Sequence, residues 1–125
     1  MSTLIWVMGG GAIGSGLRYL IANGIQEGVS SGFPYGTLSV NIVGCLLIGI
    51  LATAFGTIWD VSETTKLAVI VGVLGGFTTF SSFGNDTLTL LNQGRINEAV
   101  IYVFVSNLAG LFAVWLGAKM VSTGS

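Results

Sequence analysis

Hydrophobic residues fill four long stretches of the chain, and polar or turn-forming residues separate them. The stretches run approximately over Leu4–Ile25, Gly36–Ile58, Leu67–Leu91 and Ala99–Val121. Each is as long as the about 20 mostly apolar residues that a helix needs to cross a lipid bilayer. The pattern therefore predicts an all-α membrane protein with four transmembrane helices, which occupy most of residues 1–125 as a single domain.

The connectors contain residues that usually begin or end helices. Pro34 stands just before the second stretch, where a helix start tolerates proline, and Ser62, near Lys66, indicates a helix start at the third stretch. Gly94 is typical of a helix C-terminus, and Asn97 predicts the N-cap of the last helix. These signals predict helices joined by short loops.

The third stretch is interrupted near its middle by glycine and hydroxyl residues. Residues 75–83 read GGFTTFSSF. An unsatisfied backbone group in lipid costs several kcal/mol, so a helix break at mid-depth persists only where it is buried in protein or lines a cavity. Such breaks often bind ions, because free carbonyls and half-helix ends face the ion. We therefore predict a third helix broken at mid-membrane, with an ion site at the break.

Composition supports a membrane protein and excludes other classes. Only 7% of the residues are charged and 52% are hydrophobic, whereas soluble proteins contain roughly 25% charged residues. The first apolar stretch is too long for a signal peptide core, so we expect it to be retained. Without histidine, the chain lacks the commonest general base and metal ligand, and no nucleophile–base pair is evident. We therefore do not expect an enzyme. A net charge of -1 provides no basic patch, so we do not expect a nucleic-acid partner either.

The distribution of basic residues leaves the orientation in the membrane open. Lys66 and Lys119 fall on the side of the termini, whereas Arg18 and Arg95 fall on the opposite side. Lys/Arg bias normally sets which side is cytoplasmic, and here it is balanced. Either a partner or the insertion machinery fixes one orientation, or the chain inserts both ways and dimerises antiparallel.

Small residues recur at helical spacing in two of the stretches. Gly10 with Gly14, and Gly72 with Gly76, form small-xxx-small pairs that let helices approach closely. Such pairs serve packing within one subunit or between subunits. In a chain with 20 glycines, each pair is weak evidence for dimerisation.

Polar side chains line one face of the second stretch and one face of the fourth. Thr37 and Asn41 are four residues apart, and so are Tyr102, Ser106 and Gly110, which form a stripe of two hydroxyls and a gap. Taken singly, these groups fit hydrogen bonds inside the protein, such as an interhelical bond of about 1 kcal/mol. Taken together, they fit a line of donors to an anion.

The residues of the break offer two kinds of ion contact. Phe80 and Phe83 share a helical face and are either core side chains or ring edges that contact an anion, since ring edges are electropositive. Ser81 and the neighbouring hydroxyls either satisfy the broken backbone or line a site. Free carbonyls near Gly75 and Thr78 suit a small hard cation.

Two charged residues in the apolar stretches have open roles. Arg18, late in the first stretch, either extends to the interface or sits at a vestibule and attracts anions. Asp86 follows the break and has three alternatives: a pair with Arg18, a pair with Arg95, or a place at a vestibule.

Taken together, these blocks resemble the Fluc-type (CrcB-like) family of fluoride channels, small four-helix proteins of microbes. The resemblance covers almost the whole chain and rests on four blocks: the glycine-rich opening that ends in Arg18-Tyr19, the Gly36–Leu38 run with Asn41 and Gly44, the 75–81 break, and Gly94-Arg95.

The resemblance implies a passive fluoride channel of the cell inner (plasma) membrane that gives fluoride resistance. It implies a multi-pass, dual-topology antiparallel homodimer with two pores. It also implies a central structural sodium ion held by the backbone carbonyls of Gly75 and Thr78 from both subunits.

The resemblance also assigns roles to side chains in the pore. It implies that Asn41, Phe80 and Phe83 contact fluoride. The residues implied to line the rest of the path are Thr37, Tyr102, Ser106 and Ser81, with Arg18 at the vestibule. The chain departs from the family at Gly110, where the family often has another serine, and at Ser82, where threonine is frequent.

Two other classes of membrane protein have a similar size. A small multidrug transporter exchanges protons through a carboxylate in its first helix, but this chain has none before Glu27, at the end of that stretch. A packing subunit of a larger complex would need neither the break nor the polar stripe.

Overall fold

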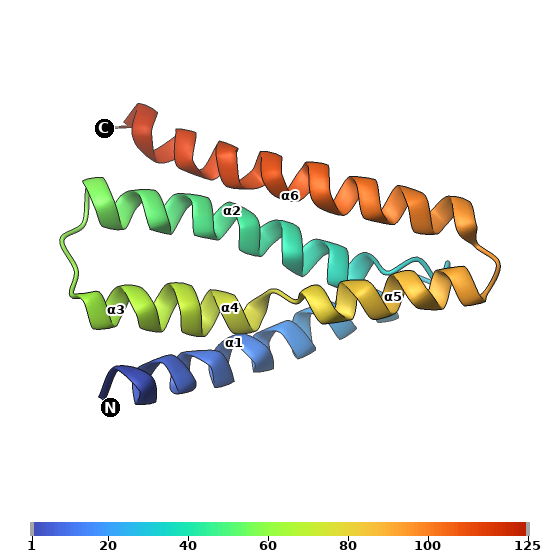
Figure 1. The fold of residues 1–125 in the computed structure, drawn as a ribbon, viewed down its shortest axis with the longest axis horizontal. Coiled ribbons are helices and arrows are strands. Elements are labelled where there is room, and N and C mark those ends of the chain that lie inside the picture. The colour runs from blue at the N-terminus through green and yellow to red at the C-terminus, as the bar shows by residue number, and fades with distance from the viewer. Residues whose placement is uncertain (1, 125) are drawn as a thin grey trace.

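The computed structural model describes residues 2–124 of the chain as helices joined by short loops. The helices are α1 (Ser2–Glu27), α2 (Tyr35–Thr57), α3 (Glu63–Leu67), the π-helix η1 (Ala68–Leu74), α4 (Gly75–Phe77), α5 (Phe80–Asn92) and α6 (Ile96–Gly124). Figure 1 shows the long helices side by side, with the start of α1 and the end of α6 at the same end of the bundle.

The four predicted spans are present in the described residues. Four helical segments are long and apolar enough to cross a membrane, and the third combines α3, η1, α4 and α5 over Glu63–Asn92. The largest difference in a boundary is at the start of the third span, which lies at Glu63 and not at Leu67. Charged and small polar residues at a helix end belong to the helix although they add nothing to its apolar run.

The predicted helix ends are correct in three cases and wrong in one, and in the first Pro34 directly precedes α2 as its N-cap residue. The Ser62 hydroxyl accepts the Thr65 N–H at 3.1 Å and caps α3. Gly94 has φ 74° and follows α5, where the Arg95 N–H reaches the Leu90 carbonyl at 2.9 Å, as in a Schellman motif. Asn97, however, lies inside α6, which begins at Ile96.

The bundle consists of two close helix pairs, α1 against η1 and α4, and α2 against α6. In the first pair, a Cβ atom on Gly14 would lie 2.0 Å from the Val73 carbonyl oxygen; in the second, one on Gly49 would lie 2.2 Å from the Val114 oxygen. Gly10 and Gly14 thus pack against the span that contains Gly72 and Gly76, so these pairs serve contacts within one chain.

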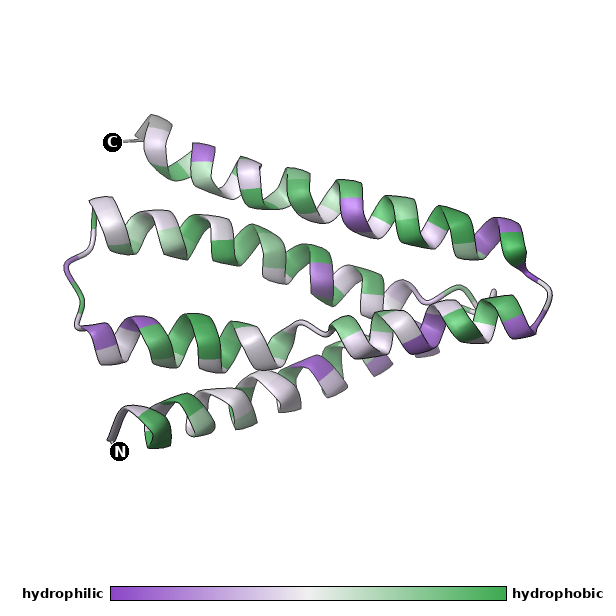
Figure 2. Ribbon diagram, viewed as in Figure 1, coloured by the Kyte–Doolittle hydropathy of each residue, from purple (hydrophilic) through white to green (hydrophobic). Residues whose placement is uncertain are grey.

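The outward surface of the bundle is apolar along its length. Figure 2 shows hydrophobic colour along all four rods, while hydrophilic segments gather at the ends and loops and occur singly within the rods. Large side chains such as Trp6, Phe104 and Leu111 are more than half exposed. Such a surface fits a surrounding of lipid acyl chains, where the apolar side chains need no partner in the protein.

The third span changes its backbone geometry twice. It winds as a π-helix over Ala68–Leu74, a feature that the sequence pattern did not predict, and then becomes extended at Thr78 (ψ 160°) and Thr79 (φ −152°, ψ 118°). The predicted break is thus present but narrower than the 75–83 segment, because Gly75 and Gly76 stay helical and the serines belong to α5.

Candidate functional site

The break in the third span is held by Asn41 of α2. The Asn41 Nδ2 group donates to the Thr79 carbonyl at 3.1 Å, and the Thr79 N–H donates to Asn41 Oδ1 at 2.8 Å. One side-chain amide therefore pairs with both backbone groups of one extended residue. This satisfies the N–H and the C=O of a residue that has left the helix, groups that would otherwise be costly to bury.

Two threonine hydroxyls satisfy the helix ends on either side of the break. Thr78 Oγ1 donates to the Leu74 carbonyl at 3.1 Å, and Thr79 Oγ1 accepts the Ser82 N–H at 3.1 Å as the N-cap of α5. The exposed Ser81 hydroxyl lies 3.4 Å from Thr79 Oγ1. The threonines therefore serve the backbone, which is one of the two roles that the sequence left open for these hydroxyls.

The same bonds change the state of the carbonyls at the break. In a continuous helix the Thr79 and Ser82 amides would bond the carbonyls of Gly75 and Thr78, but here they donate to Asn41 and to the Thr79 hydroxyl. The Gly76 carbonyl accepts instead from Arg18 Nε at 3.0 Å. Gly75 and Thr78 thus lose their helical donors, whereas Gly76 gains a substitute donor from α1.

A cavity of about 300 Å³ opens beside the break, between α2, the third span and α6. It brings together four predicted site residues from three helices, Asn41, Phe80, Phe83 and Ser106, together with Gly75 and Thr78. No charged side chain belongs to its described lining. It is therefore a mostly apolar space with a few convergent polar groups, as is typical of a small-ligand site.

The Ser106 hydroxyl is the polar group in this cavity that points most directly to a bound ligand or water. Its Oγ atom is buried and has no hydrogen-bond partner among the described residues. The other simple explanation, a bond to the backbone of its own helix, is therefore not realised. A buried hydroxyl without a protein partner indicates a water or a ligand beside it.

The two phenylalanines of the break differ in their surroundings. Their ring centroids are 5.6 Å apart with planes tilted by 43°. Phe83 packs on Tyr102 at 5.1 Å, whereas Phe80 is 83% exposed. Phe80 is therefore not a core side chain of this chain, while Phe83 is partly one.

Asp86 pairs with neither arginine and accepts a hydrogen bond from Tyr102. The Tyr102 side chain is fully buried, and its hydroxyl donates to Asp86 Oδ2 at 3.1 Å. Asp86 and Thr37 line a second cavity of about 310 Å³, next to Asn23 and Gln26 of α1. Thr37 and Ser106 therefore lie in different cavities.

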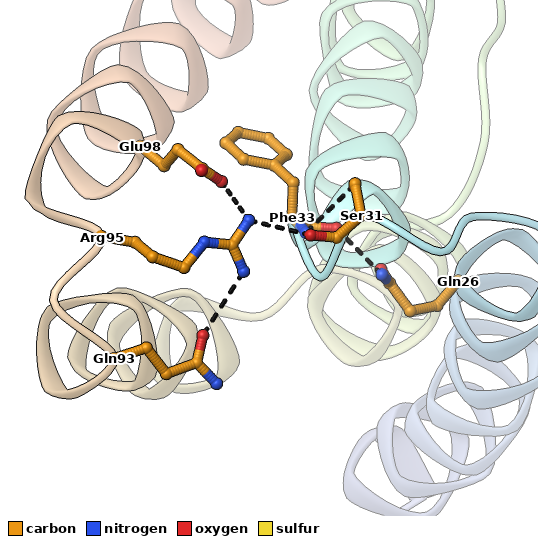
Figure 3. Close-up of polar contacts among 6 residues, drawn as sticks. All are labelled: Gln26, Ser31, Phe33, Gln93, Arg95 and Glu98. Carbon is orange, nitrogen blue, oxygen red and sulfur yellow. Dashed lines mark hydrogen bonds and ion pairs between the residues drawn. The ribbon is translucent and has the colours of Figure 1, made fainter.

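The loop between α1 and α2 forms one wall of the second cavity and is fastened from two sides (Figure 3). Gln26 donates to the Phe33 carbonyl at 2.9 Å and accepts the Gly36 N–H at 3.0 Å. Arg95 donates to the Ser31 carbonyl at 2.9 Å. The loop is thus bonded both to α1 and to the connector between α5 and α6.

Arg95 belongs to a small polar group at the start of α6. Its guanidinium pairs with Glu98 and lies near Gln93. The fastened loop also places the Phe33 ring edge-on against Tyr102, with centroids 5.6 Å apart and planes at 84°. Sequence reasoning missed this role of Gln26, and no residue spacing indicated it.

Comparison with known proteins gives one family over nearly the whole chain. The family described as "CrcB-like protein, Camphor Resistance (CrcB)" matches residues 5–118. A protein of Shewanella pealeana named "Fluoride-specific ion channel FluC" is 43% identical over 121 residues, which cover 97% of both chains.

Two further relatives carry the same name. The protein of Acidobacterium capsulatum is 41% identical over 113 residues, which cover 90% of both chains. The protein of Chloroflexus aurantiacus is 40% identical over 120 residues, which cover 96% of this chain and 95% of the relative. The relatives are thus named as ion channels and not as enzymes.

Proposed function

The chain belongs to the CrcB family, and from this premise we propose that it is a fluoride-specific ion channel of the inner (plasma) membrane. Fluoride would leave the cell down its gradient, which gives passive fluoride resistance. The observation that carries the proposal is the uncharged cavity beside the break, where Asn41, Phe80, Phe83 and the unpartnered Ser106 hydroxyl converge.

The chemistry of this cavity suits a small anion that must lose its water. Asn41 uses one Nδ2 hydrogen on Thr79 and has a second one to offer, while Ser106 offers its hydroxyl. The edges of Phe80 and Phe83 add electropositive rim contacts. Since no fixed cation lines the cavity, the anion is held weakly enough to leave, as conduction requires.

The remaining polar residues are assigned to the path on either side of this cavity. Thr37, Tyr102 and Ser106 would form a track of hydroxyls, and Ser81 would line the pore beside the break. Arg18 would add positive potential at a vestibule, which draws anions toward the entrance. Its Nε bond to Gly76 keeps the guanidinium near the break.

We further propose an antiparallel homodimer of dual topology with two pores. The even division of basic residues between the two sides supports insertion in both orientations. The exposed Phe80 ring supports a partner surface at the break, because a second copy would cover it and complete the pore wall.

A structural sodium ion would lie between the two copies at the break. The carbonyls of Gly75 and Thr78 fit such an ion, because their helical amide donors bond elsewhere, and carbonyl oxygens can replace the hydration shell of a small hard cation. Bound there, the ion would offset the partial negative charge of these carbonyl oxygens.

The test is fluoride efflux from liposomes that contain the purified protein. We expect fluoride efflux well above that of protein-free vesicles, and chloride efflux at least about a hundredfold slower, because a chloride-sized ion fits poorly among groups placed for fluoride (a factor of ten corresponds to ~1.4 kcal/mol).

Equal efflux of fluoride and chloride, or none above empty vesicles, would remove the channel assignment. Proton-coupled uptake of cationic drugs by the same vesicles would favour the multidrug-transporter alternative.

A further inference from the structure

The polar stripe on α6 has a gap that a residue of another helix fills. Tyr102, Ser106 and Gly110 follow one another at intervals of four residues, and Gly110 has no side chain to continue the stripe. A Cβ atom built on Gly110 would lie 3.4 Å from the Sγ atom of Cys45, which belongs to α2. The sulfur therefore occupies the space next to the missing third side chain.

Cys45 also faces the cavity beside the break. It lies one turn after Asn41 on α2, and both residues line the cavity together with Ser106. The buried Ser106 Oγ atom in the same cavity has no hydrogen-bond partner among the described residues, and a buried hydroxyl in that state independently points to a place for a water or a ligand. The thiol thus belongs to the same cavity lining as Asn41 and Ser106.

We propose that the Cys45 thiol is a pore-lining group that contacts the permeating anion in place of a side chain at position 110. This proposal rests on the proposed channel function. A thiol is a weak donor, so it helps to replace water around the anion without holding it tightly. The ordinary alternative is that Cys45 is a small apolar filler between α2 and α6.

The test is fluoride efflux from liposomes with three variants. Cys45→Ala removes the donor, and we expect efflux to fall about fivefold, as for the loss of one modest hydrogen bond. Cys45→Ser replaces the thiol by a hydroxyl and should stay within about twofold of the unmodified protein. Cys45→Ala/Gly110→Ser restores a donor from α6 in the vacated space and should recover most of the loss.

Val43→Ala is the matched control, because it removes a side chain of α2 that is 45% exposed. Its efflux should equal that of the unmodified protein. Unchanged efflux in Cys45→Ala would overturn the proposal, and so would a Cys45→Ala/Gly110→Ser variant no faster than Cys45→Ala. If Cys45→Ala folds poorly, the chemical test below decides, with Cys45→Ser, which keeps the shape and has no thiol, as its unreactive control.

Chemical modification gives a second readout, because Cys45 is the only cysteine of the chain. Methyl methanethiosulfonate forms a disulfide with the thiol and releases methanesulfinate, and the added S–CH₃ group narrows the cavity. Mass spectrometry of the folded protein should show one added group, and efflux of the modified protein should fall about tenfold or more, since ~1.4 kcal/mol of barrier suffices. Cys45→Ala should not respond.

Complete modification with unchanged efflux, or no modification unless the protein is denatured, would overturn the proposal. Failure of the proposed function is separate from this outcome. Absence of fluoride efflux in the unmodified protein would reject the channel assignment. Fluoride efflux that does not respond to substitution or modification of Cys45 would reject only the contact between Cys45 and the anion.

Discussion

The two halves of the third span follow one another in the sequence, yet they pack against different helices and are buried to different degrees. The half before the break, α3 to α4, lies along α1, and Gly72, Leu74 and Phe77 are buried. In the half after the break, α5, Leu90 is the one buried residue, while Phe80 is 83% exposed. The first half is held by close backbone contacts with α1, whereas the second half leaves side chains such as Phe80 exposed.

The difference shows how the two tasks of this chain are separated. Close approach of α1 and η1 fixes the first half through glycine contacts, without large side chains between the helices. The second half is attached through the Asn41 pairing at its start and the Tyr102 contacts along it. The packed first half thus positions α5, and both halves contribute to the lining of the cavity.

The largest expected effect is on the packed half. In Gly14→Val, the new side chain would meet the Val73 carbonyl, which lies 2.0 Å from the Cβ position. We expect a loss of about 3 kcal/mol or more of stability, seen as loss of monodisperse protein and of cooperative thermal unfolding.

Gly16→Val is the control, because nothing lies within 4 Å of its Cβ position. Equal stability of the two variants would mean that the close approach of α1 to the third span is not what holds the first half.

The next effect is on the exposed half. Phe80→Ile removes the ring edge but keeps a large apolar side chain, so we expect fluoride efflux to fall about tenfold, corresponding to ~1.4 kcal/mol, with unchanged unfolding. Phe83→Ile should act in the same direction.

Phe104→Ile, at an exposed position on α6, serves as the control for the loss of a ring. Unchanged efflux in both Phe80→Ile and Phe83→Ile would mean that the two rings serve only packing. The second half of the span would then have no demonstrated role in fluoride transport through these rings.

The smallest effect is at the joint between the halves. Arg18→Met keeps the apolar stem but leaves the Gly76 carbonyl without its donor at 3.0 Å. We expect a loss of about 1 kcal/mol, measured by thermal unfolding in detergent. The neighbouring Leu17→Met should have no effect, and an equal shift in both variants would show that the Arg18 bond does not stabilise the break.

The sequence predicts the spans and the position of the break, because both depend on composition and spacing. Gly94 and Ser62 were also predictable, since a residue with positive φ and a capping hydroxyl act through local chemistry. The cap at Asn97 was wrong, because α6 starts one residue before it and its first turn already includes that side chain.

The partners across helices could not be predicted from the sequence. Arg18 bonds a residue 58 positions away, and Asn41 bonds one 38 positions away. Such contacts depend on how deeply two helices approach and on their rotation about their axes, whereas periodicity gives only which face is apolar. For the same reason the partner of Asp86 could not be predicted, and its bond to Tyr102 follows from the packing of α5 on α6.

The two-point contact between Asn41 and Thr79 has a directional consequence. Because the Thr79 amide anchors the oxygen of the Asn41 carboxamide, that group cannot turn end for end without placing two donors face to face. The second hydrogen on Asn41 Nδ2 is thereby kept available as a hydrogen-bond donor. The main chain of the third span thus sets in advance which end of the Asn41 side chain is left to donate.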